Sequence, residues 1–234
     1  MATMKELKET TTVRQRVEEA LAKAHASQPQ LNAVVTFVDV EEQLTGLNEI
    51  ADGPFYGMPI ALKDNVCTQG IRTTASSKIL DNYIPVYNAH IVDKLKAAGA
   101  IVIAKASMDE LAMGGTNLTA ATGPVYNPYD HSRMAGGSSG GSAALVAAGV
   151  VPFAIGSDTG DSVRKPASFC GVLGMKPTYG RISRYGIIPY SSSLDHVGYF
   201  TRSALDAAEA LKVLAGRDDR DMTSSYEPVP DYAA

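Results

Sequence analysis

The sequence predicts an α/β fold with a substantially parallel central sheet, because helical and strand patterns alternate along its 234 residues. Two fully apolar runs, 100–104 and 150–155, are typical of parallel strands that are buried on both faces. Helical patterns precede these runs at 88–98 and 141–148. No internal repeat, low-complexity block or linker interrupts the pattern, so we expect residues 1–234 to form a single domain.

Periodicity and capping residues predict the elements of the first third. An amphipathic helix is expected over 12–26, where apolar side chains recur on one stripe and Thr11 or Thr12 can cap the first turn. The run 31–40 is rich in Val, Thr and Phe and predicts a strand. The short apolar run 59–62 ends directly before a lysine.

Capping patterns also predict the later helices. A short helix is expected after Ser107, because Glu110 lies three residues further on and completes a capping box. The last helix opens at Ser203 and closes at Gly216. The polar, proline-bearing tail 221–234 is expected to be extended.

Charge and composition exclude several classes of function. The formal net charge of −4 gives no electrostatic case for direct binding of nucleic acid or of an anionic membrane. The most apolar window, 143–155, is too short to span a membrane, and the N-terminus lacks the apolar region of a signal peptide. We therefore expect a cytoplasmic protein with Cys67 and Cys170 reduced. The four histidines show no ligand spacing, so no metal site is predicted.

Two polar, glycine-bearing segments lie beside predicted elements, the first before a helix and the second after a strand. The first, MAGGSSGGSAALVAAG at 134–149, places glycines around Ser138 and Ser139 directly before a helix, where free N–H groups and close backbone approach are available. The second, GSDTGDSVRKPASFCG at 156–171, follows a buried strand, the usual place for a site in α/β enzymes. The alternatives are a flexible linker for the first segment and an ordinary turn for the second.

A third segment, IALKDN at 60–65, places Lys63 at the end of an apolar run. A free lysine has a pKa of about 10.4, and burial can lower it by the ~3 units that a general base near neutral pH requires. The alternative is a lysine that extends from a strand end to water.

Taken together, these segments resemble the amidase signature family. The similarity runs through 57–63, the Gly/Ser loop, GSDTG and the stretch GVLGMKPTYGRISRYGIIPYSSSLDHVG at 171–198. The stretches KDNVCTQGIRTTASSKIL, MDELAMG and KPTYGRISRYG look most like one branch, the glutaminase (A) subunits of the aspartyl/glutamyl-tRNA amidotransferases. The resemblance implies the amidase-signature fold, a mixed, largely parallel sheet flanked by helices, of which this chain is the N-terminal catalytic half.

The resemblance also implies a Ser–cis-Ser–Lys triad. Lys63 matches the base, Ser138 the bridging serine in a cis peptide, and Ser162 the nucleophile that forms the acyl-enzyme. The backbone N–H groups of residues 159–162, which are Thr159, Gly160, Asp161 and Ser162, match the oxyanion hole.

For the reaction, the resemblance implies hydrolysis of glutamine, or of another small amide, to the acid and ammonia. The implied partners are amidotransferase subunits B and C. The chain itself needs no cofactor, whereas the partner that holds and activates the aminoacyl-tRNA uses ATP and Mg²⁺. This chain is therefore expected to meet tRNA only through its partner and to bind no membrane.

The sequence departs from the family at two residues of the second segment. Asp161 stands where the pattern usually has glycine, and Lys165 where this branch commonly has glutamine. An aspartate there would be strained if the position needed a positive φ, and its carboxylate would oppose a developing oxyanion unless it points away or pairs with Lys165. Family members also run on past residue 234, so the chain is a natural short form, a split gene product or a recombinant fragment.

Two further hypotheses remain open at this point. A truncated or inactive homologue would serve as a binding or assembly module. An α/β-hydrolase would use the G-x-S-x-G match at 136–140 with Asp195 and His196, but that motif requires a strand immediately before the serine, and residues 126–135 predict a loop.

Overall fold

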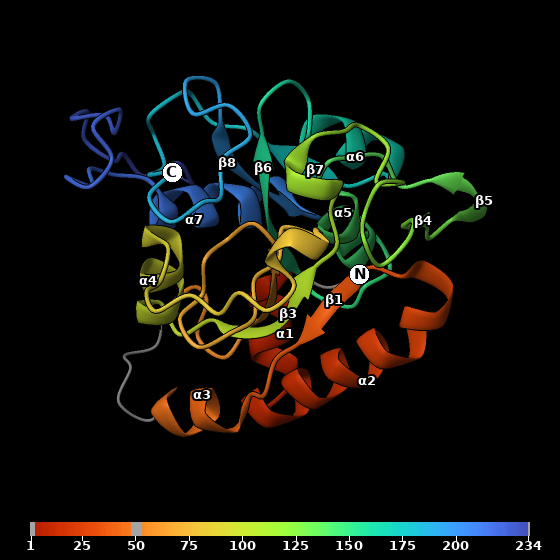
Figure 1. Cartoon of the computed structure of the whole chain (residues 1–234). Coiled ribbons are helices and arrows are strands. Elements are labelled where there is room, and N and C mark those ends of the chain that lie inside the picture. Colours follow the sequence, from red (N-terminus) through yellow and green to blue (C-terminus); the bar gives the residue numbers. More distant parts are fainter. Residues whose placement is uncertain (1–2, 48–52, 234) are drawn as a thin grey trace.

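The computed structural model describes residues 3–47 and 53–233 and contains a six-stranded sheet in the order β1-β3-β2-β6-β8-β7 (Figure 1). The three central strands β3, β2 and β6 are parallel, whereas β1, β8 and β7 join the sheet by antiparallel pairings. The expected mixed sheet is therefore confirmed, with its parallel part confined to the centre. The strands of this sheet are β1 (Val34–Phe37), β2 (Pro59–Lys63), β3 (Ile101–Ala106), β6 (Phe153–Asp158), β7 (Leu173–Met175) and β8 (His196–Thr201).

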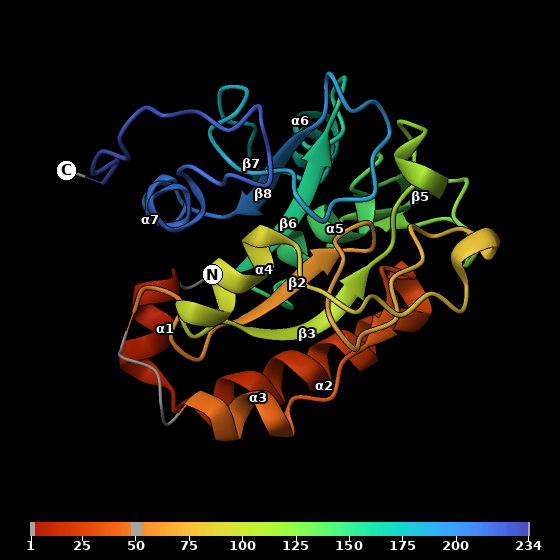
Figure 2. The ribbon, with the colours of Figure 1, turned by 60° about the vertical axis from the view of Figure 1, so that its left-hand side comes forward.

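Helices cover both faces of the sheet (Figure 2). Helices α2 and α5 pack on one face, and α4 and α7 lie together over the other. A two-stranded hairpin, β4 (Tyr126–Asn127) with β5 (Asp130–Met134), stands apart from the sheet. The helices are α1 (Met4–Thr10), α2 (Val13–Leu31), α3 (Glu41–Gly46), α4 (His90–Ala97), α5 (Gly140–Ala147), α6 (Arg164–Phe169) and α7 (Ala204–Leu214), with 3₁₀ turns η2 (Lys78–Leu80) and η3 (Glu110–Ala112).

The central strands are apolar along most of their length because both of their faces are buried. In β2, Ile60 and Leu62 belong to the core beneath α4 and α7, whereas Ala61 between them belongs to the core beneath α2 and α5. Phe153 and Ala154 of β6 divide between the two cores in the same way. Successive strand residues point to opposite faces, so a strand covered on both sides shows a continuous apolar run.

The helix predictions hold, with one exception. Thr12 caps α2 by accepting from the N–H of Gln15, and Ser203 caps α7 in the same way, but α2 continues five residues beyond the predicted end. The prediction of a capping box at Ser107 is wrong. The chain stays extended past β3, where the Ser107 N–H donates to the Ala33 carbonyl, and the following turn begins at Asp109 instead.

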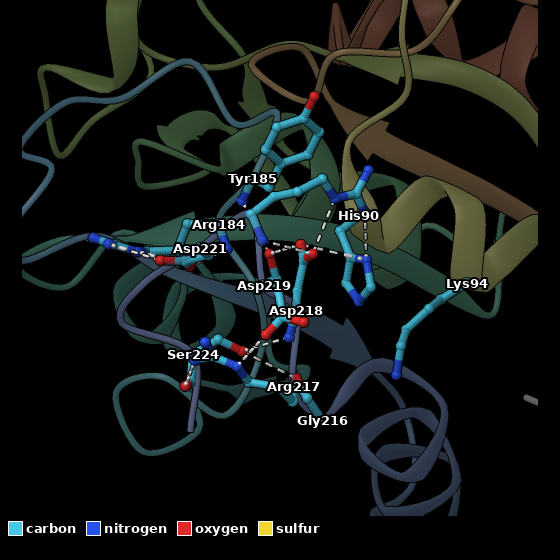
Figure 3. Close-up of polar contacts among 12 residues, drawn as sticks. His90, Lys94, Arg184, Tyr185, Gly216, Arg217, Asp218, Asp219, Asp221 and Ser224 are labelled. Atoms are coloured by element: carbon cyan, nitrogen blue, oxygen red, sulfur yellow. Dashed lines mark hydrogen bonds and ion pairs between the residues drawn. The ribbon is translucent and has the colours of Figure 1, made fainter. Parts of the chain in front are cut away.

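The segment after α7 is docked by charged side chains (Figure 3). Asp218 accepts from Ser183 Oγ at 2.6 Å and from Arg220 Nε at 2.9 Å, and Asp221 pairs with Arg184 at 3.2 Å. The tail from residue 221 to 233 contains no helix or strand, and residue 234 lies outside the described residues. Arg181 donates to two carbonyl groups of this tail. Across the two described ranges, no helix is both long and apolar enough to cross a membrane.

Candidate active site

The three segments singled out in the sequence meet at one edge of the sheet. Lys63 is the last residue of β2, and Asp158 is the last residue of β6, its parallel neighbour. The Gly/Ser loop precedes α5, which packs against both strands. Since parallel strands end at the same edge, side chains nearly a hundred residues apart in sequence converge there.

Lys63 is fully buried and is held by two serines. Its Nζ lies 2.7 Å from Ser138 Oγ, 2.9 Å from Ser157 Oγ and 3.3 Å from the Ser157 carbonyl oxygen. Burial lowers the pKa of Lys63 to about 7, although three carboxylates act in the opposite direction. The carboxylates belong to Asp109, Asp158 and Asp195. The lysine is therefore buried against the Gly/Ser loop, as predicted, and does not extend to water.

Asp109 fixes the backbone around Ser138. The peptide bond between Gly137 and Ser138 is cis, and the Asp109 N–H donates to the Ser138 carbonyl at 3.1 Å. The Asp109 carboxylate fills the space beside Gly137, where an added Cβ would lie 2.0 Å from Oδ2. The same carboxylate accepts from the N–H groups of Thr116 and Asn117. Glycine is therefore required at 137 for steric reasons.

Ser162 lies on the adjacent loop and is 6% exposed. Its carbonyl accepts from the Ser139 N–H at 3.2 Å, which ties the two serine-bearing loops together. Among the residues that the structure describes, its hydroxyl has no hydrogen-bond partner, so the expected hydrogen bond between Ser138 and Ser162 is not formed here. Such bonds often tighten only when substrate is bound.

The backbone N–H groups of the turn that ends at Ser162 are free to donate. Within residues 3–47 and 53–233, no acceptor meets the N–H groups of the four predicted oxyanion-hole residues, Thr159, Gly160, Asp161 and Ser162. The loop is held from its two sides. The Thr159 hydroxyl donates to Asp195 at 2.5 Å, and the Asp158 carboxylate accepts from the Val163 N–H at 2.9 Å. The donors are thus available to a developing negative charge next to the Ser162 hydroxyl.

Asp158 is also paired with Arg164 at 2.9 Å. Burial alone would raise the pKa of Asp158, but the Arg164 guanidinium and the neighbouring backbone N–H groups hold this pKa below its ordinary value. A buried carboxylate that stays charged fixes the start of α6, and with it the turn that carries Ser162.

The two departures from the family pattern face each other. Lys165 Nζ lies 2.6 Å from Asp161 Oδ2, and the two side chains are 33% and 45% exposed. Asp161 does not adopt a positive φ, so the backbone strain that an aspartate would have at a glycine-like position does not arise. Its charge is compensated by the neighbouring lysine.

The residues of the α/β-hydrolase hypothesis are not brought together. The prediction of a loop at 126–135 is wrong, because the chain there forms the hairpin of β4 and β5, but this hairpin belongs to a separate sheet and not to the central one. Asp195 accepts from Thr159 and from the loop N–H groups of Tyr190 and Ser191, while His196 Nδ1 lies 2.8 Å from the Leu194 carbonyl. In the described part of the chain, neither residue is hydrogen-bonded to the serine of that motif.

The sequence did not point to three polar residues of the site, Asn65, Asp109 and Ser157, and it suggested Asp195 only for the α/β-hydrolase hypothesis. Two of them were visible as neighbours of recognised residues, since Asn65 follows Lys63 by two positions and Ser157 lies within GSDTG. Asp109 carries no local signal for its place in the site, because that place depends on its contacts with Gly137 and Ser138, which are distant in the sequence. The same holds for the contact of Asp195 with Thr159.

Comparison with known proteins shows the family to which the chain belongs. Residues 15–234 match the family model described as Amidase. The A subunit of the glutamyl-tRNA(Gln) amidotransferase of Synechococcus sp. (strain RCC307) is 47% identical over 96% of the chain and 48% of its own length. The corresponding protein of Exiguobacterium sp. (strain ATCC BAA-1283 / AT1b) is 49% identical over 95% of the chain and 47% of its own length.

Solved structures show the same similarity. The A subunit of the Thermotoga maritima glutamyl-tRNA(Gln) amidotransferase has a TM-score of 0.86 at 42% identity, over 97% of this chain and 49% of that one. A 6-aminohexanoate cyclic dimer hydrolase has a TM-score of 0.89 at 36% identity, over 97% and 48%. The chain spans about half the length of the curated relatives it matches.

Proposed function

The chain belongs to the amidase signature family, and we propose that it cleaves an amide bond with Ser162 as nucleophile, Ser138 as proton carrier and Lys63 as base. The observation that carries the proposal is the 2.7 Å contact between the buried Lys63 Nζ and Ser138 Oγ. A lysine whose pKa lies at about 7 is largely neutral in slightly alkaline solution and can accept a proton there.

In the proposed reaction, Ser162 Oγ attacks the amide carbon and passes its proton to Ser138, whose own proton moves to Lys63. Charge develops on the substrate oxygen next to the free N–H groups of residues 159–162, which supports their role as the oxyanion hole. Thr159 supports this loop through its bond to Asp195. The C–N bond then breaks, the leaving nitrogen takes a proton back through the same relay, and water hydrolyses the ester on Ser162.

For the substrate, we propose glutamine, cleaved to glutamate and ammonia for tRNA-dependent transamidation in the cytoplasm. Support comes from relatives named as A subunits of glutamyl-tRNA(Gln) amidotransferases. In this proposal, subunits B and C are the partners, and ATP and Mg²⁺ act on the partner that holds the aminoacyl-tRNA. The net charge of −4 favours this division. Tight, salt-sensitive binding of tRNA by the isolated chain would contradict it.

A fluorophosphonate, which mimics a reacting amide and phosphonylates an activated serine, tests the nucleophile. Peptide mass spectrometry should find the label on Ser162, and Lys63→Ala and Ser162→Ala should each abolish labelling. A label on Ser139, with Ser162 unmodified, would refute the assignment.

Glutamine turnover decides between an enzyme and a binding module. Ammonia release that is lost in Ser162→Ala supports the glutaminase. Stable binding of subunits B and C, with neither turnover nor labelling, supports the module.

A further inference from the structure

Lys63 has three oxygen atoms around its Nζ, and Ser157 supplies two of them. The Ser157 hydroxyl lies 2.9 Å away and the Ser157 carbonyl 3.3 Å away, while Ser138 Oγ at 2.7 Å is the third. A carbonyl oxygen only accepts, but a serine hydroxyl can either donate or accept. The direction of the hydrogen bond between Ser157 and Lys63 therefore decides where the lone pair of the neutral amine points.

Asn65 sets that direction. Its Nδ2 lies 3.1 Å from Ser157 Oγ and 3.3 Å from the Ile188 carbonyl oxygen. The Ile188 carbonyl can bond only to a donor, so the amide nitrogen of Asn65 must face it, and the opposite orientation would bring two oxygens together. The backbone N–H of Ile188 also donates to the backbone carbonyl of Asn65 at 2.8 Å, which locks the two residues to each other. The Asn65 amide thus donates to Ser157 Oγ.

We propose that Asn65 is a positioning residue that holds the Ser157 hydroxyl as an acceptor for Lys63, so that the amine's lone pair is aimed at Ser138. This inference rests on the proposed function and deepens it. Neutral Lys63 has two N–H groups, which go to the hydroxyl and the carbonyl of Ser157. Its remaining position faces Ser138 Oγ, where the proton arrives.

The arrangement also accommodates the protonated lysine without rearrangement. After proton transfer, the ammonium has three N–H groups and the same three oxygens as partners. Only the hydrogen between Lys63 and Ser138 changes sides, and the two contacts to Ser157 stay as they are. Groups that are already oriented toward a developing charge need no reorganisation during the reaction. The carboxylates of Asp109, Asp158 and Asp195 act on the same ammonium from a greater distance.

A direct titration of Lys63 tests the proposal independently of catalysis. In protein labelled with ¹³C at lysine Cε, the Lys63 signal is assigned by its loss in Lys63→Gln and followed with pH. Ser157→Ala removes a bond to the ammonium, and Asn65→Leu frees the Ser157 hydroxyl to donate to the neutral amine. Both changes should lower the titration midpoint by about one to two pH units. Ser157→Thr keeps the hydroxyl and should restore the midpoint.

Matched controls separate positioning from packing. Ser142→Ala removes a buried hydroxyl that donates to the Ile155 carbonyl at 2.8 Å, and Asn127→Leu removes a buried amide that donates to the Phe169 carbonyl at 2.8 Å. Neither side chain touches Lys63, so both variants should keep the wild-type midpoint even if their thermal stability falls.

An unchanged midpoint in folded Asn65→Leu and Ser157→Ala would overturn the proposal. If Asn65→Leu does not fold, the comparison of Ser157→Ala with Ser157→Thr decides alone. Labelling of Ser162 by the fluorophosphonate should also fall about 10-fold in Ser157→Ala above the midpoint. Absence of labelling in the wild type would count against the proposed function, whereas the titration would still decide the role of Asn65.

Discussion

Replacing Lys165 by glutamine tests how strongly the Asp161 charge acts on the candidate oxyanion hole. In the wild type, the two charges lie 2.6 Å apart and largely cancel at greater distance. In Lys165→Gln, a single negative charge remains on Asp161, whose own N–H is one of the free donors of residues 159–162. The substitution should therefore slow the formation of an anionic tetrahedral intermediate while leaving the donors in place.

The expected size of this effect is modest because the pair is partly exposed. At about 6 Å and an effective dielectric constant of ~40–80, an uncompensated charge costs an oxyanion about 1 kcal/mol. That corresponds to a rate about fivefold lower. Loss of a whole donor would cost roughly 2.7–4 kcal/mol, but the Asp161 N–H stays free in this structure. The pair itself contributes about 0–1 kcal/mol to the stability of the fold.

The assay is the rate at which a fluorophosphonate labels Ser162, measured for the wild type, Lys165→Gln, Asp161→Gly and the double variant. Lys165→Gln should be about fivefold slower, and Asp161→Gly and the double variant should match each other. High salt should reduce the difference, because it screens exposed charges. Equal rates for Lys165→Gln and the wild type at low salt would refute the electrostatic reasoning. A double variant as slow as Lys165→Gln would show that the lysine acts by another route.

Three further predictions concern the base, the Gly/Ser loop and the docked tail. Labelling of Ser162 should rise with pH and level off above about 7, because only the neutral Lys63 accepts a proton, and a flat profile would contradict this role. Gly137→Ala should lower the free energy of unfolding in urea by about 3 kcal/mol, since the added Cβ would lie 2.0 Å from the Asp109 carboxylate. The control Gly160→Ala should leave stability nearly unchanged, because no atom lies within 4 Å of the added Cβ. Burial would raise the pKa of Asp221, but its bonds to Arg184 and Thr223 lower this pKa to about 2. The carboxylate therefore stabilises the fold at pH values above its ordinary pKa, and this stabilisation of about 2 kcal/mol is lost as the pH falls toward 2. Asp221→Asn should remove this part of the acid-induced loss, and an identical pH profile for both proteins would disprove it.

The parts of the fold that were predictable from the sequence depend on local patterns. The strands at 101–106 and 153–158 begin with the apolar runs 101–104 and 153–155, because two layers of helices bury them, and such runs are visible in the sequence itself. The caps of α2 and α7 were predictable because a cap is a contact between residues three apart. Ser107 and Glu110 carry the same pattern without the helix, since the extended pairing of Ser107 with Ala33 prevails. The antiparallel pairings of β8 and β7 depend on contacts between distant segments and could not be inferred from periodicity.

The same distinction between local patterns and distant contacts applies to the candidate site. Lys63, Ser138 and Ser162 stand in segments whose composition is unusual enough to attract attention, and the resemblance to a family assigned them roles. The pairing of Asp161 with Lys165 could be foreseen as a possibility, because residues four apart meet on a helical turn. Asp109 could not, since its importance lies in filling the space beside Gly137 and in its contacts with residues 116–119. Such three-dimensional complementarity leaves no periodic trace.

The pairing of Asp161 with Lys165 bears on the hypothesis of an inactive homologue. An aspartate beside the nucleophile supported that hypothesis as long as it stood alone, through strain at a glycine position and through charge opposed to the oxyanion. Neither effect arises, because Asp161 does not adopt a positive φ and a cation lies 2.6 Å from its carboxylate. Relative to glycine and glutamine, the two residues add one negative and one positive charge, so the net charge beside Ser162 is unchanged. The two departures from the family pattern therefore compensate each other in space, and together they are compatible with an oxyanion hole that still works.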